Sequence, residues 1–380
     1  MRILMISRGV PSKNDPQHGS FEFDQAKALA AMGHEVVIAS VDMRFRLIYR
    51  KIGLSVKQIN NNITAYNLFI APSAIIKLFG NRIHERYIQW QWEKIKAAII
   101  TNEAPFDVIY SHYLFNSYYA VKYFSSLSIP IVALEHWSAL NHNPIAPYVK
   151  AMAEFTYPRL SQLLTVSEPL KQRIFDIFNV PAKVVHNMVG NEFIYTNSPA
   201  EKLFTFISVG SLFPVKNHAL LISALAKLNL PKDKWQLIIV GEGNERAHLQ
   251  QLISHYNLMA NIHLVGKKSK DEIVHMLNTS HVFVLPSLSE NFSVAVLESL
   301  ACGLPVIASI CGGIRECIND KNGLLFEVGD ENGLANCLNH MFTNYKNYDR
   351  LAIANDCHER FSSEVIALQL TKIFKEVASK

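Results

Sequence analysis

The sequence of 380 residues lacks several patterns that would assign it to a familiar class of protein. Its five cysteines form no CxxC pair, and no run of about 18 apolar residues predicts a membrane-spanning helix. The apolar start MRILMIS is short, without the charged and long apolar regions of a signal peptide, and is typical of a strand. We therefore expect reduced thiols and a cytoplasmic location.

Motifs for metal, nucleophile and dinucleotide chemistry are missing as well. There is no HExxH, no clustered His/Cys spacing, no GxSxG and no DxD that could hold a metal–diphosphate. The first loop carries no GxGxxG fingerprint, so a nicotinamide or flavin site is not supported.

What is present predicts a large α/β protein. The composition of 49% hydrophobic and 18% charged residues is typical of a well-packed globular chain, and its length exceeds what one hydrophobic core usually supports. Short apolar runs rich in β-branched residues alternate with longer segments of helical period, and this rhythm restarts in the second half. The pattern predicts two doubly wound, Rossmann-like domains with parallel sheets.

The boundary between these domains is expected where apolar density drops. We predict an N-terminal domain over 1–190, a linker over 191–202 and a C-terminal domain over 203–360. The amphipathic segment 361–380 is expected to form a helix that packs back on the first domain. Since ligands bind at the carboxyl ends of parallel strands, we expect a site in an interdomain cleft.

The net charge of +5 is unevenly distributed. Residues 44–96 contain 10 basic and 2 acidic side chains, which predicts an anionic partner such as a membrane surface or a phospholipid-linked acceptor. An ordinary solvated basic face explains the count equally well. The basic residues are Arg44, Arg46, Arg50, Lys51, Lys57, Lys77, Arg82, Arg86, Lys94 and Lys96.

Two loops carry candidate anion-binding groups. Gly19 and Ser20 stand between a predicted strand and helix, where exposed N–H groups favour anions, although an ordinary connecting loop is the alternative. Lys216 follows the strand ending at Gly210 and could bind a phosphate, but a lone surface lysine is commoner.

The stretch LSENFSVAVLESLACGLP, 288–305, places two carboxylates around the start of a predicted helix. The free N–H groups of Phe292, Ser293 and Val294 would form an anion site. Glu290 and Glu298 would lie about 12 Å apart, so each could accept hydrogen bonds from sugar hydroxyls on either side of a diphosphate. Spacing alone does not separate this hypothesis from two ordinary surface acids.

Three further side chains follow predicted strands. His112 and His136 end strands of the first half, and Glu316 follows a Gly-Gly turn in the second. His136 could donate a hydrogen bond or a proton, whereas Glu316 is also typical of a plain helix start.

In this order the segments resemble glycosyltransferase family 4, the retaining nucleotide-sugar transferases of GT-B fold. The resemblance covers nearly the whole chain, and Glu290-x7-Glu298 matches the EX7E motif of the family. The other matching segments are GHEVVIAS, TVSEPL, KVVHNMV, VGSLFPVKNHALLISAL, LIIVGEGNE, IHLVGK and GGIRECINDKNGLLF.

The resemblance implies roles for individual residues. Glu290 would bind hydroxyls of the donor sugar, Glu298 the ribose and Lys216 the diphosphate, and His136 matches the active-site histidine. The implied catalytic residues are Glu290 and His136. The implied donor-binding residues are Gly19, Ser20, Gly210, Ser211, Lys216, Gly266, Lys267, Asn291, Phe292, Ser293, Val294, Glu298 and Glu316.

The resemblance also implies the reaction. The protein would be a retaining, metal-independent hexosyltransferase that moves a sugar from a UDP- or GDP-sugar to a glycan or lipid-linked acceptor in surface polysaccharide biosynthesis. No cofactor and no nucleic acid are expected, whereas peripheral contact with the inner face of the cytoplasmic membrane is.

Two departures from the family pattern keep an alternative open. Ser211 replaces the usual arginine and removes a bidentate phosphate binder, and Asn291 replaces a glycine. A neighbouring cation, Lys267 or Lys268, could compensate. The alternative is a catalytically weak or non-catalytic GT-B partner of another glycosyltransferase.

Overall fold

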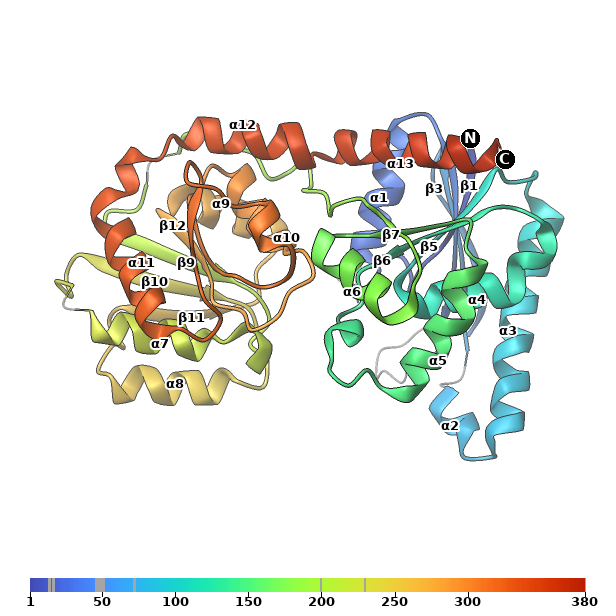
Figure 1. Ribbon diagram of the computed structural model, residues 1–380, viewed down its shortest axis with the longest axis horizontal. Coiled ribbons are helices and arrows are strands. Elements are labelled where there is room, and N and C mark those ends of the chain that lie inside the picture. The colour runs from blue at the N-terminus through green and yellow to red at the C-terminus, as the bar shows by residue number, and fades with distance from the viewer. Residues whose placement is uncertain are drawn as a thin grey trace. The chain divides into compact units, whose positions relative to one another are not determined.

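The chain forms two units in the computed structural model, which describes residues 1–12, 15, 18–44, 52–70, 73–198, 200–228 and 230–379. Unit 1 comprises Met1–Val185 together with Ile366–Lys380, and unit 2 comprises His186–Val365 (Figure 1). The segment predicted as a linker, 191–202, therefore falls within unit 2. The end of the chain belongs with unit 1, so the first unit is built from two separated stretches of sequence.

Unit 1 is organised around an eight-stranded sheet of order β3-β4-β2-β1-β5-β6-β7-β8. All of its pairings are parallel except β3 with β4. The strands are β1 (Arg2–Ile6), β2 (Glu35–Asp42), β3 (Gly53–Asn60), β4 (Ile63–Phe69), β5 (Val108–His112), β6 (Ile131–Glu135), β7 (Gln162–Thr165) and β8 (Lys183–Val184).

Strand β3 is the one strand of this sheet that the apolar pattern did not predict. It lies at the edge, pairs antiparallel with β4, and most of its side chains are exposed. An edge strand buries few side chains and is stabilised mainly by backbone pairing, so its sequence GLSVKQIN carries little of the apolar signal by which buried strands are recognised.

Helices cover both faces of this sheet. Trp92, Ile95 and Ile99 of α3 pack with residues of α4 against β1, β2 and β4 in one core. The helices of unit 1 are α1 (Ser20–Ala31), α2 (Ser73–Lys77), α3 (Asn81–Asn102), α4 (Tyr113–Phe124), α5 (Pro147–Thr156), α6 (Glu168–Phe178) and, at the end of the chain, α13 (Ser363–Ala378).

Helix α13 is anchored to unit 1 by buried contacts. Thr371 Oγ1 lies 2.8 Å from His34 Nε2, and the fully buried Phe374 ring packs 5.0 Å from the ring of Tyr110 on β5. The amphipathic pattern of the last 18 or so residues thus corresponds to a helix whose apolar side completes the core of unit 1.

Unit 2 has a six-stranded, fully parallel sheet of order β11-β10-β9-β12-β13-β14. Helices α7, α8 and α11 cover one face, and α9, α10 and α12 cover the other (Figure 1). The strands are β9 (Phe204–Val209), β10 (Trp235–Val240), β11 (Ile262–Gly266), β12 (Val282–Leu285), β13 (Val306–Ser309) and β14 (Gly323–Phe326). The helices are α7 (His218–Lys227), α8 (Arg246–His255), α9 (Lys270–Thr279), α10 (Val294–Ala301), α11 (Glu331–Asn344) and α12 (Arg350–Phe361).

Among the helices that the structure describes, none has the length and hydropathy that crossing a bilayer requires.

We predict that the return of the chain end matters for the stability of unit 1. Phe374→Ala removes a buried ring and should lower the free energy of unfolding by about 3–5 kcal/mol in chemical denaturation. Leu368→Ala on the same helix is the matched control, because Leu368 is largely exposed and its loss should cost no more than about 0.5 kcal/mol. Equal effects of the two substitutions would contradict the anchoring role of α13.

Candidate functional site

The predicted site residues lie after the carboxyl ends of parallel strands in both units. Because all strands of one sheet point the same way apart from β3, these loops gather along one edge of each sheet. In unit 2 the residues come from the loops after β9, β11, β12 and β13, and in unit 1 from those after β1 and β6.

In unit 2, Lys216 and Glu290 are in direct contact. Lys216 ends the short 3-10 helix Pro214–Lys216, and its Nζ donates to Glu290 Oε1 at 2.6 Å. The hydroxyl of Ser287 donates to the same oxygen at 2.8 Å. Both charged side chains are mostly buried, 22% and 12% exposed, which weakens screening of the pair by water. A cation and a carboxylate, 74 residues apart in sequence, thus form one polar centre.

Two glycines fix the loop that carries Glu290. Gly312 has φ of 52°, and a Cβ at this position would lie 1.9 Å from the carbonyl oxygen of Glu290. The next residue, Gly313, donates its backbone N–H to the carbonyl of Asn291 at 2.9 Å. Only glycine permits this backbone-to-backbone approach, so the Gly-Gly turn before Glu316 positions the Glu290 loop.

The start of helix α10 is held by residues that precede unit 2's first strand. Asn187 Nδ2 donates to the buried carbonyl of Phe292 at 2.8 Å. The ring of His186 packs 4.7 Å from the Phe292 ring, and its Nε2 lies 2.8 Å from Glu316 Oε2. Sequence reasoning assigned no role to His186 and Asn187, although both lie in KVVHNMV, one of the segments that carry the family resemblance.

The predicted anion site lies at the start of α10, which begins at Val294, so that Phe292 and Ser293 precede the helix. Ser293 is the N-cap, its side chain makes no capping hydrogen bond, and Val294 is the first helical residue. The first-turn N–H groups therefore have no intrahelical acceptor and carry the positive end of the helix dipole. Glu298 is half-buried about one turn further along α10.

The remaining unit 2 residues lie on the loops after β9 and β11. Gly210 is backed closely by Gly241, where a Cβ would lie 1.8 Å from the Gly210 carbonyl oxygen. The aliphatic chain of Lys216 passes 3.7 Å from the place that a Cβ on Gly210 would occupy, so this lysine packs against the residue before Ser211. Gly266 ends β11 with φ of 76°.

The structure bears on which cation could substitute for the arginine replaced by Ser211. Lys268 is engaged with Glu272 at 3.0 Å on the surface. Lys267 is exposed to solvent. Lys216 is therefore a better candidate than either, because it is partly buried and adjoins Gly210.

In unit 1, Gly19 is required by the fold of its own loop. Its φ is 69°, and a Cβ would lie 2.1 Å from the carbonyl oxygen of Gly9. Gly9 in turn leaves room for the ring of His18, whose atoms come within 2.5 Å of the place a Cβ would occupy. This mutual approach brings the backbone of the β1–α1 loop together just before Ser20 starts α1.

His136 lies in a buried aromatic cluster after β6. Its ring stacks on Tyr113 at 3.7 Å and contacts Phe21 at 4.8 Å and His112 at 5.6 Å. Burial, reinforced by His112, holds the pKa of His136 well below its usual range, so the imidazole is neutral at neutral pH. A neutral ring can donate or accept a hydrogen bond, whereas it does not serve as an imidazolium proton donor.

Glu135, the residue before His136, fixes the backbone of this turn. Its carboxylate accepts from the N–H groups of His136 and Trp137 at 2.9 and 2.8 Å and from the Tyr157 hydroxyl at 2.9 Å. Burial raises the pKa of Glu135 to about 7. The sequence pattern gave no reason to single out Glu135. It is the last residue of β6, and the residues before it in that strand are all apolar.

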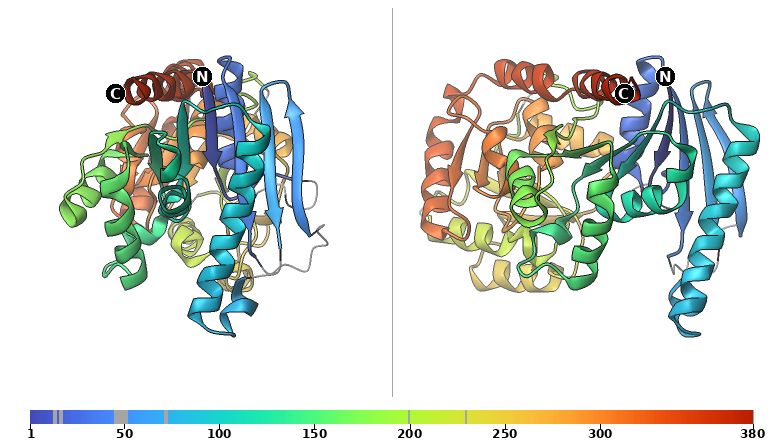
Figure 2. Two further views of the ribbon diagram at one scale, coloured as in Figure 1. Left: turned by 90° about the vertical axis from the view of Figure 1, so that its right-hand side faces the viewer. Right: turned by 45° about the vertical axis from the view of Figure 1, so that its right-hand side comes forward.

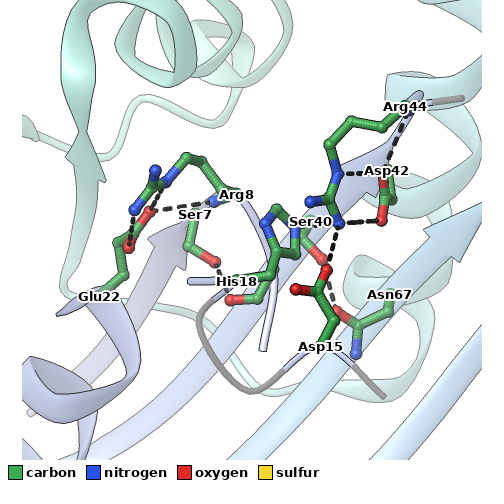
Figure 3. A network of polar contacts seen from close by, with 10 residues as sticks. Ser7, Arg8, Asp15, His18, Glu22, Ser40, Asp42, Arg44 and Asn67 are labelled. Atoms are coloured by element: carbon green, nitrogen blue, oxygen red, sulfur yellow. Dashed lines mark hydrogen bonds and ion pairs between the residues drawn. The ribbon is translucent and has the colours of Figure 1, made fainter. Parts of the chain in front are cut away.

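An ion pair between the buried Glu22 and the partly exposed Arg8 supports the histidine cluster from the β1–α1 side. Glu22 of α1 is fully buried, and Arg8 donates to its two carboxylate oxygens at 2.7 and 3.0 Å (Figure 3). Burial would raise the pKa of Glu22, but the hydrogen bonds and charge of Arg8 outweigh it and bring the pKa to about 2. The Arg8 guanidinium also lies over the Tyr113 ring, 4.4 Å from its centroid. Sequence reasoning missed this pair entirely.

A second ion cluster ties the β1–α1 loop to the end of β2. Arg44 donates to Asp42 at 2.7 and 2.9 Å and to Asp15 at 3.2 Å (Figure 3). Arg44 was predicted as part of a basic surface, but its charge is used within the fold. Three other members of that basic segment, Arg46, Arg50 and Lys51, lie outside the described residues.

Two family models match consecutive parts of the chain. The model described as Glycosyltransferase Family 4 matches residues 23–192, and the one described as Glycosyl transferases group 1 matches residues 192–356. Together they cover both units.

Curated relatives extend over much of the chain. N-acetyl-alpha-D-glucosaminyl L-malate synthase from Bacillus anthracis is 25% identical over 373 residues, 92% of this chain and 91% of that protein. N-acetylgalactosamine-N,N'-diacetylbacillosaminyl-diphospho-undecaprenol 4-alpha-N-acetylgalactosaminyltransferase from Campylobacter jejuni is 30% identical over 229 residues, 54% of this chain and 61% of that protein.

Solved structures share the fold at low identity. Sucrose-phosphate synthase from Thermosynechococcus elongatus superposes with a TM-score of 0.79 at 18% identity, covering 100% of this chain and 99% of that one. HepE from Anabaena in complex with UDP-glucose gives a TM-score of 0.73 at 18% identity, covering 99% and 100%. The expected GT-B fold, with two parallel-sheet α/β units, is thereby confirmed.

We predict that Gly312→Ala disrupts the Glu290 loop, because the added Cβ would meet the Glu290 carbonyl. Gly329→Ala is the matched control: φ at Gly329 is also positive, 79°, but no neighbouring atom lies within 4 Å of the added Cβ. The control should lower the free energy of unfolding by about 1–2 kcal/mol, which is the backbone strain alone. Gly312→Ala should lower it by at least about 2 kcal/mol more. Equal losses would show that the close approach is dispensable.

We also predict acid sensitivity of unit 1 through His112. Burial lowers its pKa from 6.5 to about 4, so its stabilising contribution is present above pH 6.5 and is lost as the pH falls toward 4. Between pH 7 and 5 this residue should account for a loss of about 2 kcal/mol in the free energy of unfolding.

The test compares denaturation at the two pH values. Both ring nitrogens of His112 lack a hydrogen-bond partner in the described part of the chain, so His112→Phe should fold and show a smaller loss on acidification. The exposed His255→Phe serves as control and should keep the wild-type response. An unchanged response in His112→Phe would exclude His112 as the source.

Proposed function

Because the chain belongs to glycosyltransferase family 4 and is an enzyme of the glycosyltransferase type, we propose a specific reaction for it. It transfers a sugar from a nucleoside-diphosphate sugar to a glycan or lipid-linked acceptor with retention of anomeric configuration, in surface polysaccharide biosynthesis. The observation that carries this proposal is the contact of Glu290 with Lys216 beside the start of α10.

The donor would be held through charge and backbone dipoles. Lys216 and the N–H groups of Phe292, Ser293 and Val294 at the start of α10 would bind the diphosphate, and no metal is needed if they also carry the charge that develops on it as it leaves. Glu290 would accept hydrogen bonds from the sugar. Its contact with Lys216 orients the carboxylate for that task.

The other predicted residues complete the donor site in this proposal. Glu298 would accept hydrogen bonds from the ribose, and the backbone at Gly266 and Lys267 would border the base. Support for a UDP-sugar comes from the neighbour HepE, which is solved in complex with UDP-glucose, and support for a lipid-linked acceptor from the relative whose name specifies a diphospho-undecaprenol.

In unit 1, neutral His136 would act as a hydrogen-bonding group rather than as a charged acid. Arg8 and Glu22 would be positioning residues, because they fix Tyr113, on which the His136 ring stacks. This assignment refines the role implied by the family resemblance. A front-face displacement through an ion-pair-like state would then depend on donor-side charge stabilisation more than on proton transfer to this histidine.

We predict that Lys216→Met weakens nucleotide-diphosphate binding by roughly 10- to 150-fold, the loss of one charge-assisted contact, in titration calorimetry. Glu290→Gln should reduce transfer by roughly 100-fold or more while nucleotide binding falls much less, because the carboxylate acts on the sugar. The matched control is Lys227→Met, which removes a lysine from another Lys–Glu pair of unit 2, 3.1 Å long and far more exposed. Its binding should equal wild type.

Assays use UDP-, GDP- and ADP-sugars with acceptor extracts. Transfer or donor hydrolysis that depends on Glu290 supports the enzyme. Ser211 favours the alternative, a non-catalytic partner of another transferase. Nucleotide binding without transfer under any donor would support that alternative, and the absence of both would contradict the proposed reaction.

A further inference from the structure

The hairpin of α2 and α3 in unit 1 exposes large apolar side chains to solvent. The two helices pack on each other, and the views from three directions show the hairpin projecting beyond the rest of unit 1 (Figures 1 and 2). At its turn Leu78 is 84% exposed and Phe79 67%, and Ile75 and Ile83 flank them at 43% and 53%. We call these four residues, with Lys77, Arg82 and Arg86, the hairpin tip.

The tip is not needed to build the core of unit 1. Further along the same helix, Trp92, Ile95 and Ile99 are buried and hold α3 against the sheet. The apolar residues of the tip lie on the turns before this anchored part. Contiguous exposed apolar side chains on a projecting element, which the fold itself does not use, mark a surface that is covered by a partner.

The cations of the tip are available to such a partner. Lys77, Arg82 and Arg86 are exposed, and the structure shows no ion pair for them with any residue that it describes. Glu85 is the acid among them, which leaves an excess of positive charge. In the same basic segment, Arg44 and Lys96 are bound to carboxylates and cannot contribute in this way. Among the basic residues of this segment that the structure describes, Arg44 and Lys96 thus pair within unit 1, whereas Lys77, Arg82 and Arg86 face outward.

The tip lies at the functional edge of unit 1. Strand β4 ends at Phe69, in register with Asp42 at the end of the parallel strand β2, and leads into α2. Helix α3 then leads back to the opposite, amino end of the parallel strands, where β5 begins. The tip therefore stands at the carboxyl edge of the sheet, where His136 is also found. Ile52, 71% exposed, adjoins the same edge, because Gly53 pairs with Phe69.

We propose that the hairpin tip inserts its apolar side chains into the interfacial region of an anionic bilayer. Lys77, Arg82 and Arg86 contact lipid phosphates while Leu78 and Phe79 enter the acyl boundary, which is how amphipathic elements bind membranes. Insertion brings the carboxyl edge of unit 1 to a lipid-linked acceptor. That consequence rests on the proposed function, whereas membrane binding itself does not.

A lipid surface fits the tip better than a protein partner does. The tip is a projecting turn with apolar residues at its apex and cations around it, and these two features match the acyl layer and the phosphate layer of a membrane. Three cations without an ion pair in the described part of the chain would each need a separate carboxylate in a protein interface, while an anionic membrane supplies phosphate at any position.

The test is sedimentation of the full chain with vesicles. We expect binding to vesicles of phosphatidylcholine mixed with phosphatidylglycerol, weaker binding to phosphatidylcholine alone, and a loss of binding as salt is raised. Leu78→Ser with Phe79→Ser should reduce the partition coefficient by roughly 10- to 100-fold per side chain. Lys77→Gln with Arg82→Gln and Arg86→Gln should reduce it by about fivefold per charge on the anionic vesicles alone.

Matched controls remove the same chemistry elsewhere. Met259→Ser with Leu351→Ser removes two exposed apolar residues of unit 2, and Lys202→Gln with Lys321→Gln and Lys346→Gln removes three exposed cations. These variants should bind vesicles as wild type does. Absence of vesicle binding by the wild-type chain would overturn the proposal. Equal losses in the control variants would overturn it as well, because they would indicate nonspecific electrostatic binding or binding through a different surface.

The nucleotide titration separates this proposal from the proposed reaction. Hairpin variants that lose vesicle binding should keep wild-type nucleotide affinity, because no tip residue belongs to the donor site. If the wild-type chain binds vesicles through the tip but no nucleotide, the membrane proposal stands and the proposed reaction fails. If it binds nucleotide and no vesicles, the reverse holds.

Discussion

The parallel pairing of the strands is the constraint on which the rest of this protein depends. In a parallel sheet every loop that follows a strand emerges at the same edge, so residues far apart in sequence gather there. Lys216 and Glu290 meet in unit 2 for this reason, as do Arg8, Glu22 and His136 in unit 1. The α2–α3 hairpin reaches the same edge of unit 1, because it follows β4.

Backbone-to-backbone contacts then set the positions of the charged groups within that edge. A carbonyl lies where a Cβ would be at Gly19, Gly241 and Gly312, and each contact fixes the loop that carries predicted site residues. Such contacts confer rigidity without using side chains. In unit 2 the Lys216–Glu290 pair is thereby held beside the start of α10.

The charged groups of unit 1 differ from those of unit 2 in their surroundings. There a complete ion pair, Arg8 with Glu22, lies beside two histidines that burial keeps neutral. Its net stabilisation is small, because desolvation of the buried Glu22 and screening of the partly exposed Arg8 by water offset the attraction. Its benefit is orientation: the guanidinium fixes the Tyr113 ring, which stacks on His136.

The sequence by itself determined the strand and helix rhythm, the two-part parallel architecture and the placement of Lys216, Glu290, Glu298 and His136 after strands. Buried strands and glycine turns are local features, so a single sequence displays them. Only the tertiary structure decided the pairing of Arg8 with Glu22, the hold of Asn187 on Phe292, and the division of the basic segment into the internal Arg44 and the exposed hairpin tip. These depend on which residues meet across long stretches of chain, and edge strand β3 escaped prediction because exposed positions carry no apolar pattern.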